Sequence, residues 1–344
     1  MTIVSPGFFD LQVNGFAGVD FNDPACSIED LRRATEHLRA TGVTRYLPAL
    51  ISSSFEAFAR CARNFLALDH PAVAGLHMEG PYISPADGAR GAHSRAVVID
   101  PSIDDFKRRQ EAAGGRIVLV TLAPERPRAL DLIEYLVAAG VRVAIGHTEA
   151  APHEIRAAIS AGATLSTHLG NGCAALLPRH PNLIWEQLAA DELFASLIVD
   201  GHHLPPATVK AMIRAKGPAR TILVSDATAA AGGAPGRYRL GELQIELGAD
   251  GRVAAPGTQH LAGSALTLNQ AVANAVRFAS LSLDEAISMA ATLPARYMGR
   301  QPAGRVMAEW DPERFRLEVI EVREDAPDLG ERACSGITQP AATN

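Results

Sequence analysis

The stretch IVLVTLAPERPRALDLIEYLVAAGVRVAIGH, residues 117–147, contains the pattern that decides the fold. It holds a β-rich apolar run at Ile117–Leu122, a helical pattern at Pro127–Ala139 and a second apolar run at Arg142–Ile145. Proline is favoured in the first turn of a helix, which supports the helix start at Pro127. A strand, a helix and a second strand in this order are typical of a βαβ unit in a parallel sheet.

The same alternation runs through most of the chain on both sides of this stretch. It predicts eight strands, at Gly7–Val13, Thr44–Leu47, Ala74–Met78, Ile117–Leu122, Arg142–Ile145, Thr164–Thr167, Ala195–Val199 and Thr221–Val224. It also predicts helices between the strands, at Ser27–Thr41, Ser54–Asp69, Pro101–Ala113, Pro127–Ala139, Pro152–Ala161 and Pro205–Ala215. Eight strands that alternate with helices predict an α/β fold of the TIM barrel type. A doubly wound sheet fits less well, because no G-x-G-x-x-G motif follows the first strand.

The pattern changes after Asp226. It then predicts a loop, a hairpin, two helices and a last strand, in that order, at Ala227–Gly236, Tyr238–Val253, Leu266–Ala279, Leu283–Ala291 and Phe315–Val322. The tail at residues 325–344 mixes proline, glycine, serine and charge without periodicity, so we expect disorder there.

The composition disfavours several classes of protein. The chain has 344 residues, 47% of them hydrophobic, and a formal charge of -6. A chain of this length can bury a large core, and a mildly acidic balance disfavours binding to nucleic acid or to an anionic membrane surface. The four cysteines lie far apart, as in a protein with free thiols, and no apolar run approaches the roughly 18 residues of a membrane helix. The N-terminus carries no signal-peptide pattern, so we expect a soluble cytoplasmic protein.

Polar residues that could bind a metal or take part in catalysis lie directly after several of the predicted strands. Glu79 follows the third strand, His147 the fifth, His168 the sixth and Asp226 the eighth. In a TIM barrel the carboxyl ends of all strands meet at one mouth, so these side chains should lie close together. One carboxylate and two imidazoles can bind a divalent transition metal and leave a position for water. Asp226 could take the proton of that water and pass it to a leaving group, which is the chemistry of hydrolysis.

Each of these residues also has an ordinary interpretation. A single histidine after a strand is more often a hydrogen-bonded structural residue than a ligand. Glu79, which is followed by glycine and proline, could cap a turn, and Asp226 could form an Asx turn. The joint placement of all four residues favours the metal site.

Seven short stretches carry a resemblance to a known family and occur in that family's order. They are PGFFDLQVNG (6–15), LHMEGPY (76–82), IGHT (145–148), THLGN (167–171), DGHH (200–203), SDAT (225–228) and LAGS (261–264). Together they resemble the N-acetylglucosamine-6-phosphate deacetylases of the amidohydrolase superfamily, over about residues 5–300. The resemblance implies a distorted (β/α)8 TIM barrel that carries a metal, with a small β-sandwich built from both chain ends.

The same resemblance implies a metal site and a catalytic pair. Glu79, His147 and His168 would hold one divalent metal per subunit, for which we expect zinc, with iron, manganese or cobalt as alternatives. Asp226 would be the catalytic acid and base. His93, in RGAH (90–93), would contact the acetamido carbonyl and help to polarise the bond under attack.

The resemblance also implies how the substrate is bound. Asn171 and Gly172 would bind it partly through the backbone, and Leu261 would lie against it. Arg179 and His203 match phosphate-binding positions, a role that suits guanidinium and imidazolium donors. Family members complete these phosphate contacts across a subunit interface, which implies a homodimer.

Three features depart from the family pattern. Gln12-x-Asn14 stands where many amidohydrolases have His-x-His, and neutral amides are poor metal ligands, so we expect one metal rather than two. Five residues precede the PGF stretch, where the family has a few dozen, so we expect a reduced sandwich at residues 237–256 and 314–323. The surroundings of Arg179, LPRHPNLIW (177–185), differ from the Gly/Arg-Glu-Pro-Gly stretch that is common in the family.

The leading hypothesis is a metal-dependent deacetylase of N-acetylglucosamine 6-phosphate, which hydrolyses an amide carbon–nitrogen bond. Because the surroundings of Arg179 are altered, a second hypothesis is a deacylase that acts on another N-acyl amino sugar without phosphate. The missing His-x-His pair leaves a further alternative, in which the chain is a barrel that binds a sugar phosphate without catalysis. The complete set of a carboxylate, two histidines and a proton shuttle argues against this last alternative, because a binding protein gains little from it.

Overall fold

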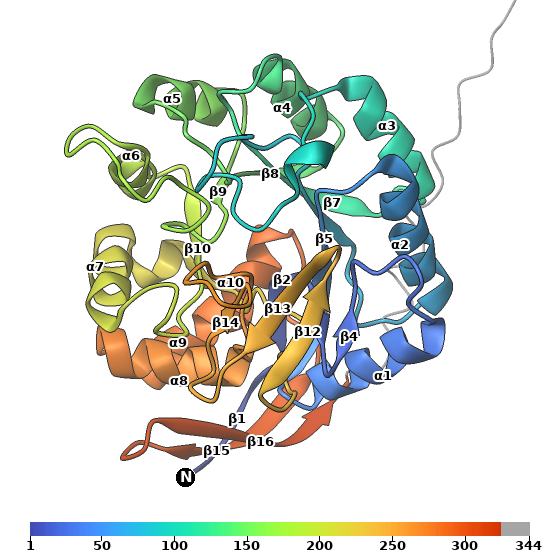
Figure 1. Cartoon of the computed structure of the whole chain (residues 1–344). Coiled ribbons are helices and arrows are strands. Elements are labelled where there is room, and N and C mark those ends of the chain that lie inside the picture. Colours follow the sequence, from blue (N-terminus) through green and yellow to red (C-terminus); the bar gives the residue numbers. More distant parts are fainter. Residues whose placement is uncertain (325–344) are drawn as a thin grey trace, which may run out of the picture.

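The computed structural model describes residues 1–324, and the tail for which we expected disorder lies outside the described residues. Eight parallel strands form the central sheet, in the order β11-β10-β9-β8-β7-β6-β5-β2 (Figure 1). Their bounds are β2 Phe8–Val13, β5 Val43–Ile51, β6 Leu76–Glu79, β7 Ile117–Leu122, β8 Arg142–Ile145, β9 Leu165–Ser166, β10 Phe194–Leu197 and β11 Thr221–Leu223. Each strand overlaps one of the eight that the sequence predicts, so the TIM barrel is confirmed.

The barrel closes where β2 meets the residues that follow β11. Val13 and Ala227 form a parallel bridge there. The Asp226 N–H donates to the Gln12 carbonyl at 3.0 Å, and the Asn14 N–H donates to the Ala227 carbonyl at 2.7 Å. The backbone therefore fixes Gln12, Asn14 and Asp226 relative to one another.

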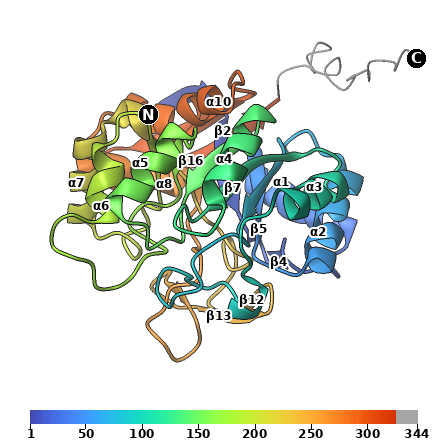
Figure 2. The same cartoon turned by 90° about the horizontal axis from the view of Figure 1, so that it is seen from above.

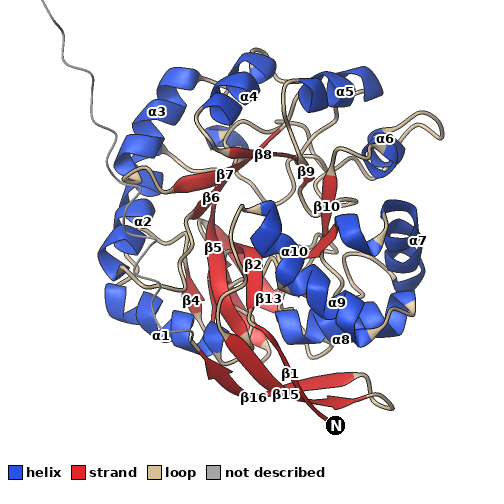
Figure 3. Cartoon of the chain, turned by 180° about the vertical axis from the view of Figure 1, so that it is seen from behind, coloured by secondary structure: helices blue, strands red, loops and turns tan. Residues whose placement is uncertain are grey.

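Helices cover the outside of the barrel (Figures 1 and 3). Their bounds are α1 Ile28–Arg39, α2 Phe55–Leu68, α3 Ile103–Ala112, α4 Ala129–Ala138, α5 Pro152–Ser160, α6 Leu183–Ala189, α7 Pro206–Lys216, α8 Leu268–Ala279, α9 Leu283–Ala290 and α10 Thr292–Tyr297, with single 3₁₀ turns at Arg95–Val97 and Pro218–Arg220. Ser27, Ser54 and Ser102 cap the first three helices by accepting a backbone N–H. All the predicted helices are present, whereas α6 and α10 were not predicted, because seven and six residues are too few to show a helical period.

One hydrophobic cluster fills the barrel and the layer between strands and helices. It includes Phe8, Tyr46, Met78 and Leu119, all fully buried. The strands are apolar on both faces because one face lines the barrel interior and the other contacts the helices. None of the described helices has the length and apolar character needed to span a membrane.

Small antiparallel sheets complete the fold. Their strands are β1 Thr2–Pro6, β15 Arg305–Asp311 and β16 Arg316–Arg323 in one sheet, β12 Gly236–Leu240, β13 Leu243–Leu247 and β14 Val253–Ala254 in a second, and β3 Gly15–Phe16 with β4 Val19–Asp20 in a third. The hairpin and the last strand, which we expect as elements of a reduced sandwich, lie in two of these sheets. The last strand, β16, pairs with β15, which in turn pairs with β1, and neither β15 nor β1 was predicted. Figure 2 shows the hairpin at one end of the barrel and the N-terminus, which leads into β1, at the other.

The β12–β13 hairpin lies over the carboxyl-terminal mouth of the barrel (Figure 1). Its apolar underside, which includes Leu240 and Ile245, forms a cluster of its own with Ile51 at the end of β5. At its turn, the Gly241 N–H donates to Asp20 Oδ2 at 2.6 Å. The other oxygen of Asp20 accepts the Asn22 N–H at 2.9 Å. The hairpin is therefore attached to the barrel both by apolar packing and by one carboxylate.

Asp20→Ala should loosen the hairpin and leave the barrel intact. The substitution removes the acceptor of the Gly241 N–H, so the free energy of local opening should fall by about 1–3 kcal/mol for the amides of β12 and β13. Native-state hydrogen exchange measures this quantity residue by residue. Asp23→Ala is the matched control, because the Asp23 carboxylate accepts the Ala25 N–H within its own turn. Unchanged exchange of the hairpin amides in Asp20→Ala would contradict the attachment described above.

Candidate metal centre and active site

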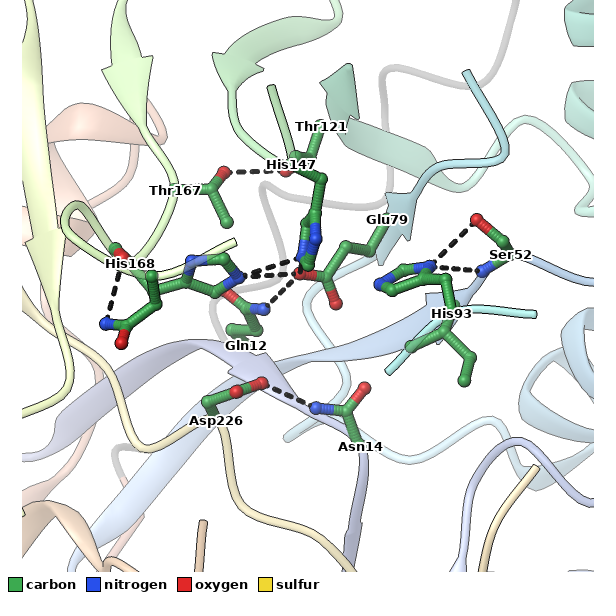
Figure 4. Close-up of polar contacts among 12 residues, drawn as sticks. Gln12, Asn14, Ser52, Glu79, His93, Thr121, His147, Thr167, His168 and Asp226 are labelled. Atoms are coloured by element: carbon green, nitrogen blue, oxygen red, sulfur yellow. Dashed lines mark hydrogen bonds and ion pairs between the residues drawn. The ribbon is translucent and has the colours of Figure 1, made fainter. Parts of the chain in front are cut away.

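Glu79, His147 and His168 meet at the mouth of the barrel, as the sequence predicts (Figure 4). Glu79 ends β6, His147 follows β8 and His168 follows β9, and all three side chains are buried. Glu79 Oε1 lies 3.1 Å from His147 Nε2 and 3.0 Å from His168 Nε2, and the two nitrogens are 3.1 Å apart. Among the described residues, this is the cluster whose ligand atoms, all within 4.8 Å of one another, could hold a metal ion.

The backbone at the strand ends turns sharply to point these side chains inward. His147, His168 and Asp226 have φ angles of 51°, 29° and 50°, in the left-handed region that residues other than glycine rarely adopt. Such a conformation costs on the order of 1–3 kcal/mol per residue and persists only where the surrounding structure imposes it. Three residues of the same site share it, which indicates that the fold places them for a function.

The contacts of His147 fit a bound cation. Its Nδ1 lies 3.0 Å from the carbonyl oxygen of Ala89, which can only accept a hydrogen bond, so this nitrogen carries the ring proton. In a neutral imidazole the Nε2 lone pair then faces the Glu79 carboxylate oxygen, another acceptor. Two lone pairs that face each other at this distance repel unless a proton or a metal ion lies between them. One carboxylate and two imidazoles are a donor set that suits zinc and related divalent metals.

Gln12 and Asn14, which replace the His-x-His pair, act as hydrogen-bond donors to the site. Gln12 Nε2 donates to Glu79 Oε1 at 2.7 Å, and Asn14 Nδ2 donates to Asp226 Oδ1 at 2.7 Å. Each amide therefore orients one carboxylate. This use of both side chains is consistent with the expectation of a single metal.

The two carboxylates of the site have pKa values that are shifted in opposite directions. Burial alone raises the pKa of Glu79, but the hydrogen bonds and charges of His147 and His168 outweigh it and hold the pKa well below its usual range. Burial, together with the nearby negative charge of Glu79, raises the pKa of Asp226. A carboxylate with a lowered pKa suits a metal ligand, and a neighbouring carboxylate with a raised pKa suits a group that takes up and returns a proton.

His93 lies beside the metal cluster. Its ring centroid is 4.4 Å from that of His147, and burial lowers its pKa to about 3, so the ring is neutral at physiological pH. The sequence predicts His93 at this site only through the family resemblance, because the residue lies in a loop and follows no strand.

A cavity of about 1070 Å³ opens above these residues. Asn171, Gly172, His203 and Leu261 line it, as predicted. Arg179 does not line the cavity of its own chain, because it lies exposed on the loop between β9 and α6. The hairpin residues 239–244 also line the cavity, a position that their strand pattern did not reveal.

Ser52 is a site residue that sequence reasoning missed. It follows β5, and its side chain and backbone N–H both contact His93 (Figure 4). The predicted second strand ended at Leu47, before Pro48, whereas β5 continues to Ile51. The strand pattern therefore does not predict that Ser52 lies at the mouth of the barrel.

Comparison with known proteins identifies the family. The amidohydrolase family profile matches residues 3–312. The chain belongs to the amidohydrolase family. Members of this family depend on a bound metal, which agrees with the donor set found here.

Several relatives in this family are similar over most of their length. The N-acetylglucosamine-6-phosphate deacetylase of Lysinibacillus sphaericus is 32% identical over 311 residues, covering 89% of this chain and 79% of that protein. The N-acetylgalactosamine-6-phosphate deacetylase of Shewanella sp. (strain ANA-3) is 34% identical, covering 88% of this chain and 77% of that protein. The N-acetyl-D-glucosamine-6-phosphate deacetylase of Mycobacterium smegmatis, solved as a mutant in complex with N-acetyl-D-glucosamine-6-phosphate, superposes with a TM-score of 0.85 at 33% identity, covering 93% of this chain and 86% of that one.

The metal site yields a prediction about stoichiometry. The wild-type chain should bind one equivalent of zinc, and His168→Ala should weaken binding by more than about 100-fold, since loss of a residue that hydrogen-bonds a metal ligand already costs about 10–100-fold. Equilibrium dialysis followed by elemental analysis measures both quantities. His203→Ala is the control, because His203 lines the same cavity outside the cluster and should leave zinc binding unchanged. Equal zinc affinity in His168→Ala and the wild type would contradict the assignment of the ligands.

Proposed function

We propose that this amidohydrolase removes the acetyl group from N-acetylglucosamine 6-phosphate, producing glucosamine 6-phosphate and acetate. The observation that carries the proposal is the joint presence of Glu79, His147, His168, His93 and Asp226 at the mouth of one cavity. The similarity to a structure that holds this sugar phosphate, across 93% of the chain, supports the choice of substrate.

The metal site has a defined place in this proposal. Glu79, His147 and His168 would hold one divalent metal, and zinc is the ion that we propose. Such a metal, when bound, lowers the pKa of water to near neutrality and polarises a carbonyl group. Gln12 keeps Glu79 in position through the hydrogen bond from its amide.

Asp226 moves the proton in the proposed reaction. Asn14 occupies its Oδ1, which leaves Oδ2 to take a proton from the attacking water. The oxygen of that water adds to the acetamide carbon while His93 donates a hydrogen bond to the carbonyl oxygen. The proton then passes from Asp226 to the sugar nitrogen as the carbon–nitrogen bond breaks. The raised pKa of Asp226 suits a group that must hold this proton between the two steps.

We propose that His203 and Arg179 bind the phosphate, with Arg179 acting in the cavity of a second subunit. His203 lines the cavity, and its Nδ1 lies 2.7 Å from Asp200 Oδ2, which holds the ring in place. The segment around Arg179 carries apolar side chains that a partner subunit would cover, since Leu176 is 91% exposed and Trp185 is 54% exposed. A homodimer would bring Arg179 to the neighbouring phosphate. We also propose a cytoplasmic location, which is supported by the free thiols of Cys26, Cys61 and Cys173.

The epimeric sugar phosphate is the second candidate substrate. A relative named for N-acetylgalactosamine 6-phosphate matches this chain as well as those named for the glucosamine compound. A deacylase for an amino sugar without phosphate stays open as well, since Arg179 lies outside the cavity of its own chain. Acetate release from both phosphorylated sugars and from N-acetylglucosamine, with metal-stripped and zinc-reloaded protein, separates these cases. Release only from reloaded protein and only from N-acetylglucosamine 6-phosphate is the expected result, and no release from either phosphorylated sugar would contradict the proposal.

Asp226→Asn should lose turnover and keep the metal. The amide cannot accept the proton of the attacking water, and loss of general acid–base catalysis lowers kcat by about 10²- to 10⁴-fold. Steady-state acetate release combined with metal analysis of the same sample gives both quantities. Full activity in Asp226→Asn would contradict the proton transfer proposed above.

Arg179→Ala should weaken binding of the phosphorylated sugar by about 10- to 100-fold in KM, as expected for loss of a charged hydrogen bond. Mixing this variant with Asp226→Asn tests whether the arginine acts across subunits. A mixed dimer would contain one site with both an intact Asp226 and an intact Arg179 from the partner, so activity at a substrate concentration below the KM of Arg179→Ala should rise on mixing. No recovery after demonstrated subunit exchange would contradict the shared site.

A further inference from the structure

Ser52 makes two contacts with a single nitrogen of His93. The Ser52 backbone N–H donates to His93 Nδ1 at 3.2 Å, and Ser52 Oγ lies 2.8 Å from the same atom. Both residues are buried. Figure 4 shows the His93 ring between Ser52 and Glu79, with its second nitrogen on the side of Glu79.

These contacts determine which ring nitrogen carries the proton. A backbone N–H can only donate a hydrogen bond, so His93 Nδ1 must offer its lone pair. A neutral imidazole has one protonated nitrogen, and here it must be Nε2. The Ser52 hydroxyl can rotate, and it donates to the same lone pair because no proton is present on Nδ1.

We propose that Ser52 is a positioning residue that fixes His93 in the Nε2–H form, so that His93 acts as a hydrogen-bond donor to the reacting carbonyl and not as a base. This inference rests on the proposed function, since it assigns a donor to the amide that the chain would cleave. It also excludes one alternative mechanism, because a ring nitrogen that already carries a proton cannot take one from water.

The strand ends explain why Ser52 lies at this position. Ile51 pairs with Glu79 in the β5–β6 ladder, so Ser52 is the first residue beyond the paired part of β5. Its N–H would be left without a strand partner, and His93 Nδ1 accepts it. Gly80, directly after Glu79, makes room for the hydroxyl, since a Cβ there would lie 2.2 Å from Ser52 Oγ. The residue next to a proposed metal ligand therefore leaves space for the hydroxyl that contacts His93.

The hydroxyl has a consequence for catalysis as well as for orientation. A hydrogen bond donated to Nδ1 withdraws electron density from the ring, which makes the Nε2–H a stronger donor. This gain is largest when the carbonyl oxygen carries the negative charge of the transition state. Loss of the hydroxyl should therefore appear in kcat and not in KM.

The tautomer is tested without substrate, on the full-length zinc-loaded chain. Nitrogen-15 NMR of histidine-labelled protein shows which ring nitrogen is bonded to hydrogen, and His93→Gln identifies the signals that belong to His93. A proton on Nε2 is the expected result, and a proton on Nδ1 would overturn the proposal. Because no turnover is involved, failure of the proposed deacetylation would leave this result interpretable.

Kinetics test the role of the hydroxyl. Ser52→Ala should lower kcat by about 3- to 10-fold, the effect of losing one hydrogen bond, with KM unchanged. Ser52→Thr keeps the hydroxyl and should restore most of the loss. Ser53→Ala is the matched control, because the hydroxyl of Ser53 makes no hydrogen bond within residues 1–324. An unchanged kcat in Ser52→Ala would overturn the role assigned to Ser52.

Discussion

Glu79 Oε1 and the Nε2 atoms of His147 and His168 lie within 3.0–3.1 Å of one another in a buried space. A buried cluster of this kind is costly unless a cation occupies its centre. The three residues come from β6, β8 and β9, and two of them adopt a left-handed backbone to reach the centre. The barrel therefore brings together, at one mouth, a carboxylate and two imidazoles that a cation can hold together.

The surrounding residues orient the groups that would act on a substrate. Gln12 orients Glu79, Asn14 orients Asp226 and Ser52 orients His93, each through a hydrogen bond to the group that it places. None of these three side chains is charged, so each one orients its partner without adding charge to the buried site. The substitution of amides for the His-x-His pair thus removes two possible metal ligands and supplies two donors to the carboxylates.

Most of the barrel was predictable because its strands are short apolar runs separated by helices with clear starts. The metal cluster was predictable for the same reason, since Glu79, His147 and His168 each stand at or directly after a strand. The end of β5 was not predictable, because Pro48 interrupts the apolar run and the pattern does not show that the strand continues to Ile51. The position of Ser52, which follows Ile51, was therefore not predictable either. The position of the hairpin over the mouth depends on the contact between Asp20 and Gly241, which are 221 positions apart. A local sequence pattern cannot predict a contact between residues so far apart. Arg179 was predicted as part of the site, yet it lies outside the cavity of its own chain, because it is exposed on the loop between β9 and α6.

We propose that one divalent cation occupies the space between Glu79, His147 and His168. Anomalous diffraction from crystals of the zinc-loaded protein, recorded on both sides of the zinc absorption edge, tests it most directly. The account predicts one strong peak per chain, at about 2.0–2.2 Å from the Nε2 atoms of both histidines and from a carboxylate oxygen of Glu79. A zinc peak elsewhere in the chain, with these three residues in direct contact with one another, would contradict it.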